Sequence, residues 1–153
     1  MARRIWVVAG TASVLLLAGV FAAFASSSAA GTKIHVIEHA TTDTVIDTGG
    51  AGDTSGDLLT FHNLIYNRTD TTRVGSDQGE CVRISPQQGT WECTFTTFLS
   101  KGHISVEGPF SDNHSTRFSV TGGTGAYSHA SGTMLLRSRA GGAKYDFLFR
   151  VRS

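Results

Sequence analysis

The stretch Lys-Tyr-Asp-Phe-Leu-Phe-Arg-Val-Arg at residues 144–152 shows the pattern on which the fold depends. Tyr145, Phe147, Phe149 and Val151 occupy alternate positions, and most of the positions between them are charged. Successive side chains of a β-strand point to opposite faces of a sheet. This run therefore predicts a strand with one face against an apolar core and the other in water.

Seven further short runs alternate in a similar way and are separated by Gly, Asn, Asp and Ser. They cover residues 33–39, 57–66, 73–84, 91–99, 103–110, 117–121 and 132–137. No window of 12 or more residues after the first 25 shows helical spacing of apolar residues. Eight strands in so short a chain predict an all-β fold, an eight-stranded antiparallel barrel with a central cavity. A β-sandwich is the alternative, since periodicity alone does not separate the two.

Composition limits the classes of partner. The chain has 153 residues, which is enough for one domain. Only 16% of the residues are charged, the formal net charge is +1, and like charges form no block. Nucleic-acid binders normally carry a basic patch or stripe, so we expect no nucleic-acid partner.

The first 25 residues have the features of a secretory signal peptide. Arg3 and Arg4 precede residues 5–25, which carry no charge, and Ala-Phe-Ala at residues 23–25 is a small-x-small cleavage pattern. Ala30 ends a second such pattern, so cleavage after residue 30 is the alternative.

The domain boundaries follow from this signal. We expect a signal peptide at 1–25, a linker at 26–32 and a barrel domain at 33–153. The predicted location is secreted or extracytoplasmic, with no membrane contact once the signal is removed. An uncleaved membrane anchor is the alternative, because 21 uncharged residues are long enough to cross a bilayer.

Export changes the interpretation of the two cysteines, Cys81 and Cys93. Outside the cytosol a pair of cysteines is more often a disulfide than a metal site. If the turn at residues 85–89 is a hairpin centred on Gln87, the two cysteines lie directly opposite one another. No His stands at a metal-ligand spacing from either cysteine, so we expect neither a metal nor a cofactor.

Glu38 continues the apolar face formed by Ile34 and Val36. A carboxylate on an inward face is costly unless it is paired, and its pKa tends to rise. General acids, general bases and charge-stabilising groups arise in this way, so Glu38 is the candidate catalytic residue. The alternative is that the strand ends at Val36 and that Glu38 is solvated.

Asn63 lies between Phe61 and Ile65 on one face of its predicted strand. Its amide can contact a ligand, or it can satisfy loop backbone or a neighbouring polar group. His62 points to the opposite face. The other five His residues are scattered, with no acid–base partner at a readable spacing.

Two longer segments closely resemble the allene oxide cyclase and dirigent barrel superfamily. They are GHISVEGPF at residues 102–110 and FSVTGGTGAY at residues 118–127. Phe-His-Asn at 61–63 and Gly-Glu-Cys-Val at 79–82 add to the resemblance, which extends from about Lys33 to the C-terminus.

The resemblance implies an eight-stranded antiparallel barrel with an apolar central cavity. Plant cyclases of this superfamily close an unstable fatty-acid epoxide into a cyclopentenone, and dirigent proteins orient phenoxy radicals for stereoselective coupling. The family's strand-one glutamate matches Glu38 and its cavity cysteine matches Cys81. Ala40 and Phe110 stand where the cyclases have an asparagine and a tyrosine.

The strand faces and the resemblance together predict a ligand cavity with Glu38 as its polar group. The other expected cavity residues are Asn63, Phe61, Phe95, Val106, Phe110 and Phe147. We expect an exported barrel that binds an apolar small molecule and directs its cyclisation or stereoselective coupling. A natural-product cyclase or isomerase using Glu38 and a structural barrel without ligand are the alternatives. Whether the chain is an enzyme stays open at this point, and a homo-oligomer is compatible with the sequence.

Overall fold

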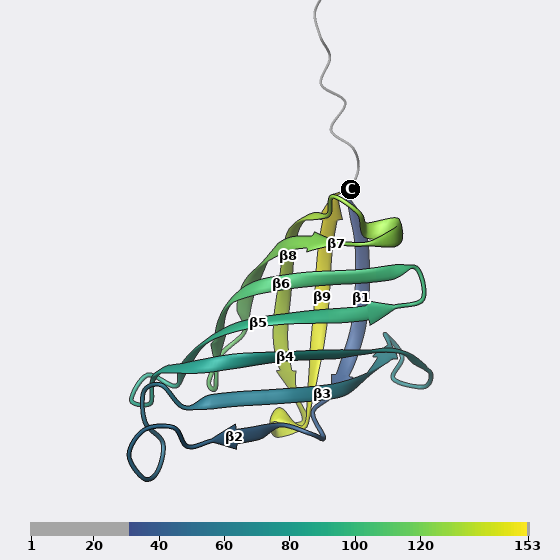
Figure 1. Ribbon diagram of the computed structural model, residues 1–153. Coiled ribbons are helices and arrows are strands. Elements are labelled where there is room, and N and C mark those ends of the chain that lie inside the picture. Colours follow the sequence, from purple (N-terminus) through teal and green to yellow (C-terminus); the bar gives the residue numbers. More distant parts are fainter. Residues whose placement is uncertain (1–30, 153) are drawn as a thin grey trace, which may run out of the picture.

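The computed structural model describes residues 31–152, which form a closed antiparallel β-barrel (Figure 1). The strands are β1 (Thr32–His39), β2 (Thr44–Ile46), β3 (Leu58–Asn67), β4 (Arg73–Ser85), β5 (Thr90–Leu99), β6 (Gly102–Ser111), β7 (Thr116–Gly123), β8 (Ser131–Arg139) and β9 (Lys144–Arg152). Two single-turn 3-10 helices, η1 (Gly125–Tyr127) and η2 (Ala140–Gly142), lie in the last two connections between strands. These two are the helices of residues 31–152, and neither is long and apolar enough to cross a membrane.

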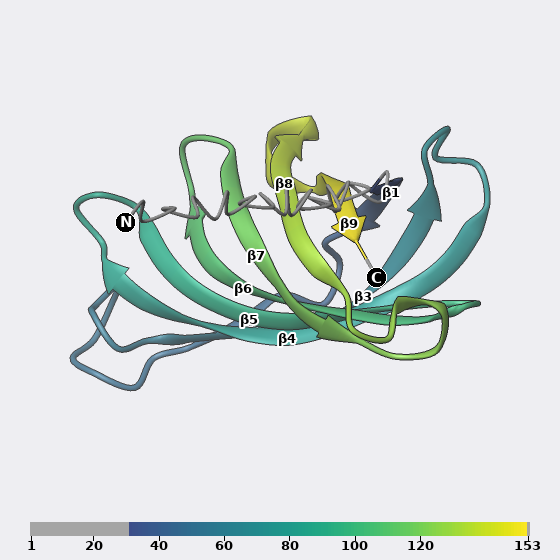
Figure 2. The same ribbon diagram turned by 90° about the horizontal axis from the view of Figure 1, so that it is seen from above.

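The barrel closes because β1 pairs with β9 on one side and with β3 on the other. Each of the remaining strands from β3 to β9 pairs with the next one along the chain. Figure 2 shows the resulting curved wall from above. The predicted eight-stranded antiparallel barrel is confirmed, and the sandwich alternative is excluded.

The ninth strand, β2, was not predicted. It pairs with residues 58–60 of β3, whereas β1 pairs with residues 64–67, so the two short pairings follow one another along the same edge of β3. All three residues of β2 are exposed. A three-residue strand without a buried face leaves no alternating pattern in the sequence.

The eight predicted strands begin and end within two residues of their expected ranges. The signal peptide expected at 1–25, its cleavage sites and residues 26–30 of the linker lie outside the described residues. Thr32, expected in the linker, is the first residue of β1.

Aromatic side chains fill much of the interior. Phe95 on β5 contacts the rings of Phe61, Phe118 and Phe147, with ring centroids 5.7, 5.2 and 5.5 Å apart respectively. Edge-to-face and tilted pairs at these distances stabilise beyond the burial of their apolar area. Rings on four strands therefore meet in the core, where they pack together with buried aliphatic side chains such as Ile65, Ile104 and Met134.

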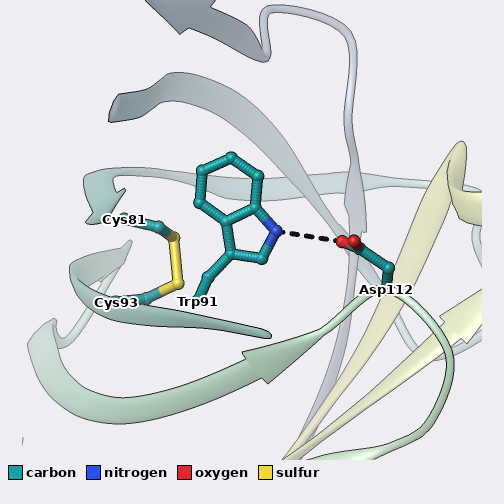
Figure 3. The surroundings of a disulfide bond; sticks show 4 residues. All are labelled: Cys81, Trp91, Cys93 and Asp112. Atoms are coloured by element: carbon teal, nitrogen blue, oxygen red, sulfur yellow. Dashed lines mark hydrogen bonds between the residues drawn. A yellow bond between two sulfur atoms is a disulfide. The ribbon is translucent and has the colours of Figure 1, made fainter. Parts of the chain in front are cut away.

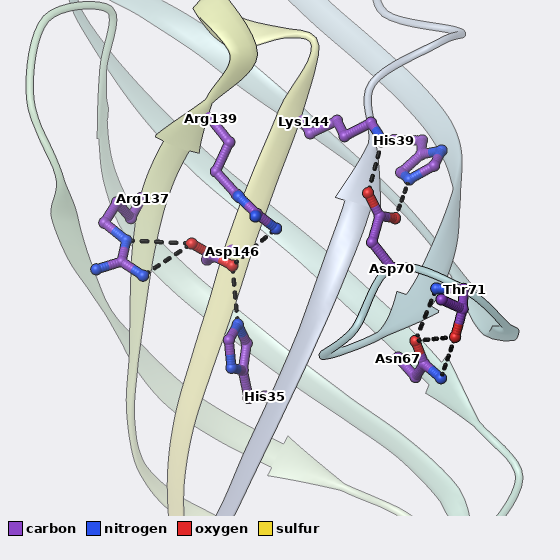
Figure 4. Close-up of polar contacts among 9 residues, drawn as sticks. All are labelled: His35, His39, Asn67, Asp70, Thr71, Arg137, Arg139, Lys144 and Asp146. Carbon is purple, nitrogen blue, oxygen red and sulfur yellow. Dashed lines mark hydrogen bonds and ion pairs between the residues drawn. The ribbon is translucent and has the colours of Figure 1, made fainter.

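Two aspartates stabilise the outer face where the barrel closes (Figure 4). Asp70, in the turn after β3, accepts hydrogen bonds from His39 on β1 at 2.6 Å and from Lys144 on β9 at 2.6 Å. Asp146 on β9 accepts hydrogen bonds from His35 on β1 at 2.8 Å and from Arg137 on β8 at 2.9 Å. These contacts connect four neighbouring strands around the closing seam.

Two His residues have acid–base partners that no short spacing in the sequence indicates. His35 and Asp146 are 111 positions apart and His39 and Asp70 are 31 apart, so only the closed barrel brings them together. Hydrogen bonds from Lys144 and His39 lower the pKa of Asp70. Burial by itself would raise the pKa of Asp146, but the donors from His35 and Arg137 lower it.

Cys81 on β4 and Cys93 on β5 are directly opposite one another and form a disulfide (Figure 3). The predicted bridge and its register are confirmed. The hairpin carries a bulge between Arg83 and Ser85, but this irregularity lies on the turn side of the bridge and leaves the Cys81–Cys93 register unchanged.

Removal of this bridge is expected to destabilise the barrel. It closes a loop of 13 residues counted inclusively, at a sequence separation of 12. The chain-entropy model gives such a loop about 3 kcal/mol, which corresponds to a fall in Tm on the order of 10 °C. Thermal melts of a Cys81→Ala/Cys93→Ala double variant should show this fall.

The neighbouring pair Val82 and Glu92 faces outward and provides the control, Val82→Ala/Glu92→Ala, which should melt close to the unmodified protein. A double cysteine variant that melts within a degree or two of this control would contradict the stabilising role of the bridge.

Candidate functional site

A cavity of about 530 Å³ occupies one end of the barrel interior. Its lining includes exposed residues that mark its mouth, among them Asp43, Val45, Asp112 and Gly141. Seven aromatic side chains line it: Phe61, Trp91, Phe95, Phe110, Phe118, Tyr145 and Phe147. Its volume and aromatic lining are typical of sites for small organic molecules.

Four of the expected cavity residues, Phe61, Phe95, Phe110 and Phe147, line this space. Glu38, the expected polar group, lines it as well, and the Cys81–Cys93 bridge forms part of the wall. These residues come from β1, β3, β4, β5, β6 and β9, so only the closed barrel brings them together.

Two expected cavity residues lie elsewhere. Val106 and Asn63 are fully buried and are not among the lining residues. Val106 pairs with Phe95 across β5 and β6 and belongs to the packed core. Inward direction on a strand is therefore not sufficient for a place in the cavity, because part of the barrel interior is filled by packed side chains.

Asn63 connects the polar groups behind the cavity. Its amide nitrogen donates to Oε1 of Glu38 at 2.8 Å and to Oδ1 of Asp43 at 2.6 Å. Its oxygen accepts from the backbone N–H of Thr41 at 3.0 Å and of Thr42 at 2.9 Å. Both amide hydrogens are thus used within the protein, and Asn63 fixes the loop after β1 against the strand rather than offering its amide to a ligand.

Glu38 remains inside the barrel, with only 5% of its surface exposed, so the solvated alternative is excluded. Burial raises its pKa to about 7; the hydrogen bond from Asn63 opposes this shift, and the charge of Asp43 adds to it. A carboxyl group with a pKa near 7 can both release and take up a proton at neutral pH.

Asp77 is a second buried acid, which the sequence analysis missed. It lies on β4 and is completely buried, and within the described residues neither of its oxygens has a hydrogen-bond donor. Burial, the charge of Glu38 and a hydrogen bond to Glu38 raise the pKa of Asp77 to about 10. A contact with the backbone N–H of Asn63 opposes this shift only in part, and protonation removes the charge that burial disfavours. Asp77 is four residues before Cys81, so the alternation that placed Cys81 inside also placed Asp77 there.

Tyr145 places a phenol hydroxyl group in the cavity. Phe110, which stands where the cyclases have a tyrosine, has none. Tyr145 lies on β9 directly opposite Glu38, and its ring packs edge-on against Phe110 with centroids 5.8 Å apart. Burial, followed by the charges of Glu38 and Asp43, raises the pKa of Tyr145 to about 12. The hydroxyl group therefore stays neutral and available as a hydrogen-bond donor at physiological pH.

Trp91 forms the wall near the mouth and is held from two sides. Its indole N–H donates to Asp112 at 3.0 Å (Figure 3), and the guanidinium group of Arg83 lies 4.2 Å from its ring centroid. Arg83 also forms ion pairs with Asp53 and Asp112. The indole is thus fixed in place, and the positive charge behind it is matched by two carboxylates.

Across residues 31–152, no three His, Cys, Asp or Glu side chains are grouped so that they could hold a metal ion. The polar groups at the cavity instead form an acid pair, Glu38 and Asp77, with a neutral phenol beside it. This arrangement can exchange a proton with a bound molecule and can stabilise positive charge next to an aromatic wall.

The acid pair predicts an unusual dependence of stability on pH. Both carboxyl groups have folded pKa values above their unfolded values, so the folded state binds more protons. Their contribution to stability is present below about pH 4 and is lost as the pH rises through 7 and toward 10, by at most about 1.4 kcal/mol per pH unit for each proton. Asp77→Asn removes the larger of the two shifts, so its Tm at pH 9 should exceed that of the unmodified protein by several degrees.

Melts of both proteins at pH 5, 7 and 9 measure this difference. Glu107→Gln, which removes an exposed carboxyl group on the outer face of β6, should follow the unmodified protein. Equal slopes of Tm against pH for Asp77→Asn and the unmodified protein would show that Asp77 does not hold a proton in the fold.

Three solved structures share this barrel. A pyocyanin demethylase superposes with a TM-score of 0.66 at 24% identity, covering 77% of this chain and 100% of its own. A pterocarpan synthase dirigent protein gives 0.63 at 17% identity, covering 79% of this chain and 86% of its own. The exo-specific intermolecular Diels-Alderase AbnU gives 0.64 at 14% identity, covering 80% of this chain and 98% of its own. At these identities the likeness concerns the fold.

A sequence profile of one family covers nearly the whole barrel. The profile described as allene oxide cyclase matches residues 38–151, from Glu38 on β1 to Val151 on β9. The match includes both acids of the buried pair, both cysteines and the phenol of Tyr145. With the closed barrel and the shared fold of the three solved structures, it shows that the chain belongs to the allene oxide cyclase family.

Proposed function

We propose that this protein is an exported barrel that binds an apolar small molecule in its cavity and directs the cyclisation or stereoselective coupling of that molecule. The observation that carries the proposal is the 530 Å³ cavity with seven aromatic side chains and Glu38 in its wall and with Asp77 buried behind Glu38. A barrel with a purely structural role has no need of either feature. Burying two carboxyl groups costs stability, so their presence supports a chemical role.

The aromatic walls act on the conformation of the bound molecule. Rings from several strands, among them Phe61, Phe95 and Phe147, limit the shapes a ligand can adopt and keep water away from it. Holding reacting atoms in one geometry lowers the entropic part of the barrier to ring closure or coupling. Exclusion of water also suppresses hydrolysis of a reactive intermediate.

The polar groups act on charge and protons. Glu38 can transfer a proton to or from the bound molecule, and Asp77 restores or holds the proton behind it. Tyr145, on the neighbouring strand, supplies a neutral hydrogen-bond donor to the same space. Such general acid–base assistance typically contributes about 10²–10⁴-fold to a rate.

Two further observations support the proposal. The Diels-Alderase and the pterocarpan synthase dirigent protein are named for product-forming reactions and have the same barrel. The disulfide supports export, because such bridges persist mainly outside the cytosol.

Native mass spectrometry of the protein purified from its own host tests the proposal. The unmodified protein should carry a small molecule that Leu59→Trp lacks, because the larger ring fills the cavity at Leu59. Thr60→Trp adds the same ring on the other face of β3 and should retain the molecule. Glu38→Gln should bind the unconverted precursor, with turnover reduced by about 10²–10⁴-fold.

Equal ligand content in the Leu59→Trp and Thr60→Trp variants would place binding outside the cavity. Unchanged turnover in Glu38→Gln would remove Glu38 from the chemistry while leaving the binding function in place.

A further inference from the structure

The charge of the cavity lining is one-sided. Nineteen of the described residues line the cavity. Seven are aromatic and three carry carboxyl groups, and none of the nineteen is Lys, Arg or His. The three carboxyl groups are those of Glu38 inside the cavity and of Asp43 and Asp112 at its mouth. Asp77 adds a fourth directly behind Glu38.

Cations next to cavity-lining residues are already paired with carboxylates other than those of Glu38 and Asp43. Arg83 lies behind Trp91 and is ion-paired with both Asp53 and Asp112, two carboxylates for one guanidinium group. Lys144, next to Tyr145 along β9, is bound to Asp70 on the outer face. Of the three carboxyl groups in the lining, Asp112 is thus paired with Arg83, whereas no ion pair within residues 31–152 reaches Glu38 or Asp43.

An aromatic wall adds to the same preference. The faces of Trp, Tyr and Phe rings carry partial negative charge and attract cations at short range. Carboxylates beside such rings, in a space that excludes much of the water, attract a positive ligand and repel a negative one more strongly than they would in bulk solvent.

We propose that the molecule bound in this cavity is a cation, a flat aromatic or polyunsaturated compound with a delocalised positive charge or a protonated amine, whose charge lies beside Glu38 and Asp43. This inference rests on the proposed function: the ligand keeps an apolar framework, and the inference adds a positive charge to it. A fatty acid, a phosphorylated compound or another anion does not fit the lining. The rings contact the flat framework of the ligand, and the carboxyl groups select its charge.

The same groups make the affinity depend on pH. The groups that face Glu38 are Asn63 on β3, Asp77 on β4, Tyr145 on β9 and Asp43 in the loop after β1. With a pKa of about 7, Glu38 loses its proton between pH 6 and 8 while Tyr145 stays neutral. A permanently charged ligand competes with that proton, so its affinity should rise over this range, whereas a neutral ligand should show no such rise.

Three probes with the same tricyclic framework test the inference by isothermal titration calorimetry. They are 10-methylacridinium, a permanent cation; acridine, which is neutral at pH 8; and anthracene-9-carboxylate, an anion. At pH 8 the cation should bind about tenfold tighter than acridine or more, and the anion should bind weakest. The affinity of the cation should fall severalfold when the pH is lowered from 8 to 6.

Matched variants assign the preference to individual carboxyl groups. Asp43→Asn, at an exposed position that retains its hydrogen-bond acceptor for Asn63, should weaken the cation severalfold and leave acridine unchanged. Glu38→Gln should also remove the pH dependence. Glu107→Gln, the same charge change on the outer face of β6, should alter neither.

The possible failures are distinguishable. Equal binding of all three probes, or a preference for the anion, overturns the cationic ligand class and leaves the binding function standing. Absence of binding by every probe overturns both. If Glu38→Gln does not fold, the Asp43→Asn comparison and the pH profile of the unmodified protein still decide the question.

Discussion

Two carboxyl groups, Glu38 and Asp77, share the apolar interior of the barrel, and the site depends on how the hydrogen-bonding needs of this pair are met. Like charges so close in an apolar space cannot both ionise at neutral pH, so the pair retains a proton. The Asn63 amide donates one hydrogen bond to Glu38 and one to Asp43, and no side-chain donor within the described residues reaches Asp77. The proton itself is therefore the remaining partner, and this is why the pair is suited to proton transfer.

The closure of the barrel and the geometry of this site have the same origin. β1 pairs with β3 and β9, and these three strands carry Glu38, Asn63 and Tyr145 respectively. On the outside of the same seam, Asp70 and Asp146 connect the strands through charged hydrogen bonds. Loosening of the seam would separate the acid from its amide and its phenol, so the stability of the closure and the precision of the site are linked.

The strands and the disulfide could be predicted because each leaves a local pattern in the sequence, whereas the choice of a barrel over a sandwich depended on the family resemblance. Alternation marks a strand wherever one face is buried, and the spacing of Cys81 and Cys93 about Gln87 fixes their register. β2 left no such pattern, because it is three residues long and exposed on all of them. The same local patterns also place Glu38 inside.

The rest of the site could not be predicted, because it depends on contacts between distant strands. Asp77 was identifiable as inward-facing, but its proximity to Glu38 requires the closed barrel. Asn63 was expected to contact either a ligand or polar groups of the protein, and only the position of the loop after β1 decides between them. Val106 shows the converse: it points inward as expected, but neighbouring rings occupy the space beside it. A strand pattern gives the direction of a side chain, whereas its neighbours depend on the diameter and filling of the barrel.

The protonation of the acid pair can be measured directly by ¹³C NMR of the carboxyl carbons in protein labelled at Asp and Glu. Glu38→Gln and Asp77→Asn assign the two signals. The account predicts that one carboxyl group of the pair is still protonated at pH 8 and that the other titrates near pH 7. Ionisation of both groups below about pH 5, as for exposed Asp and Glu, would contradict the shared proton and the chemistry inferred from it.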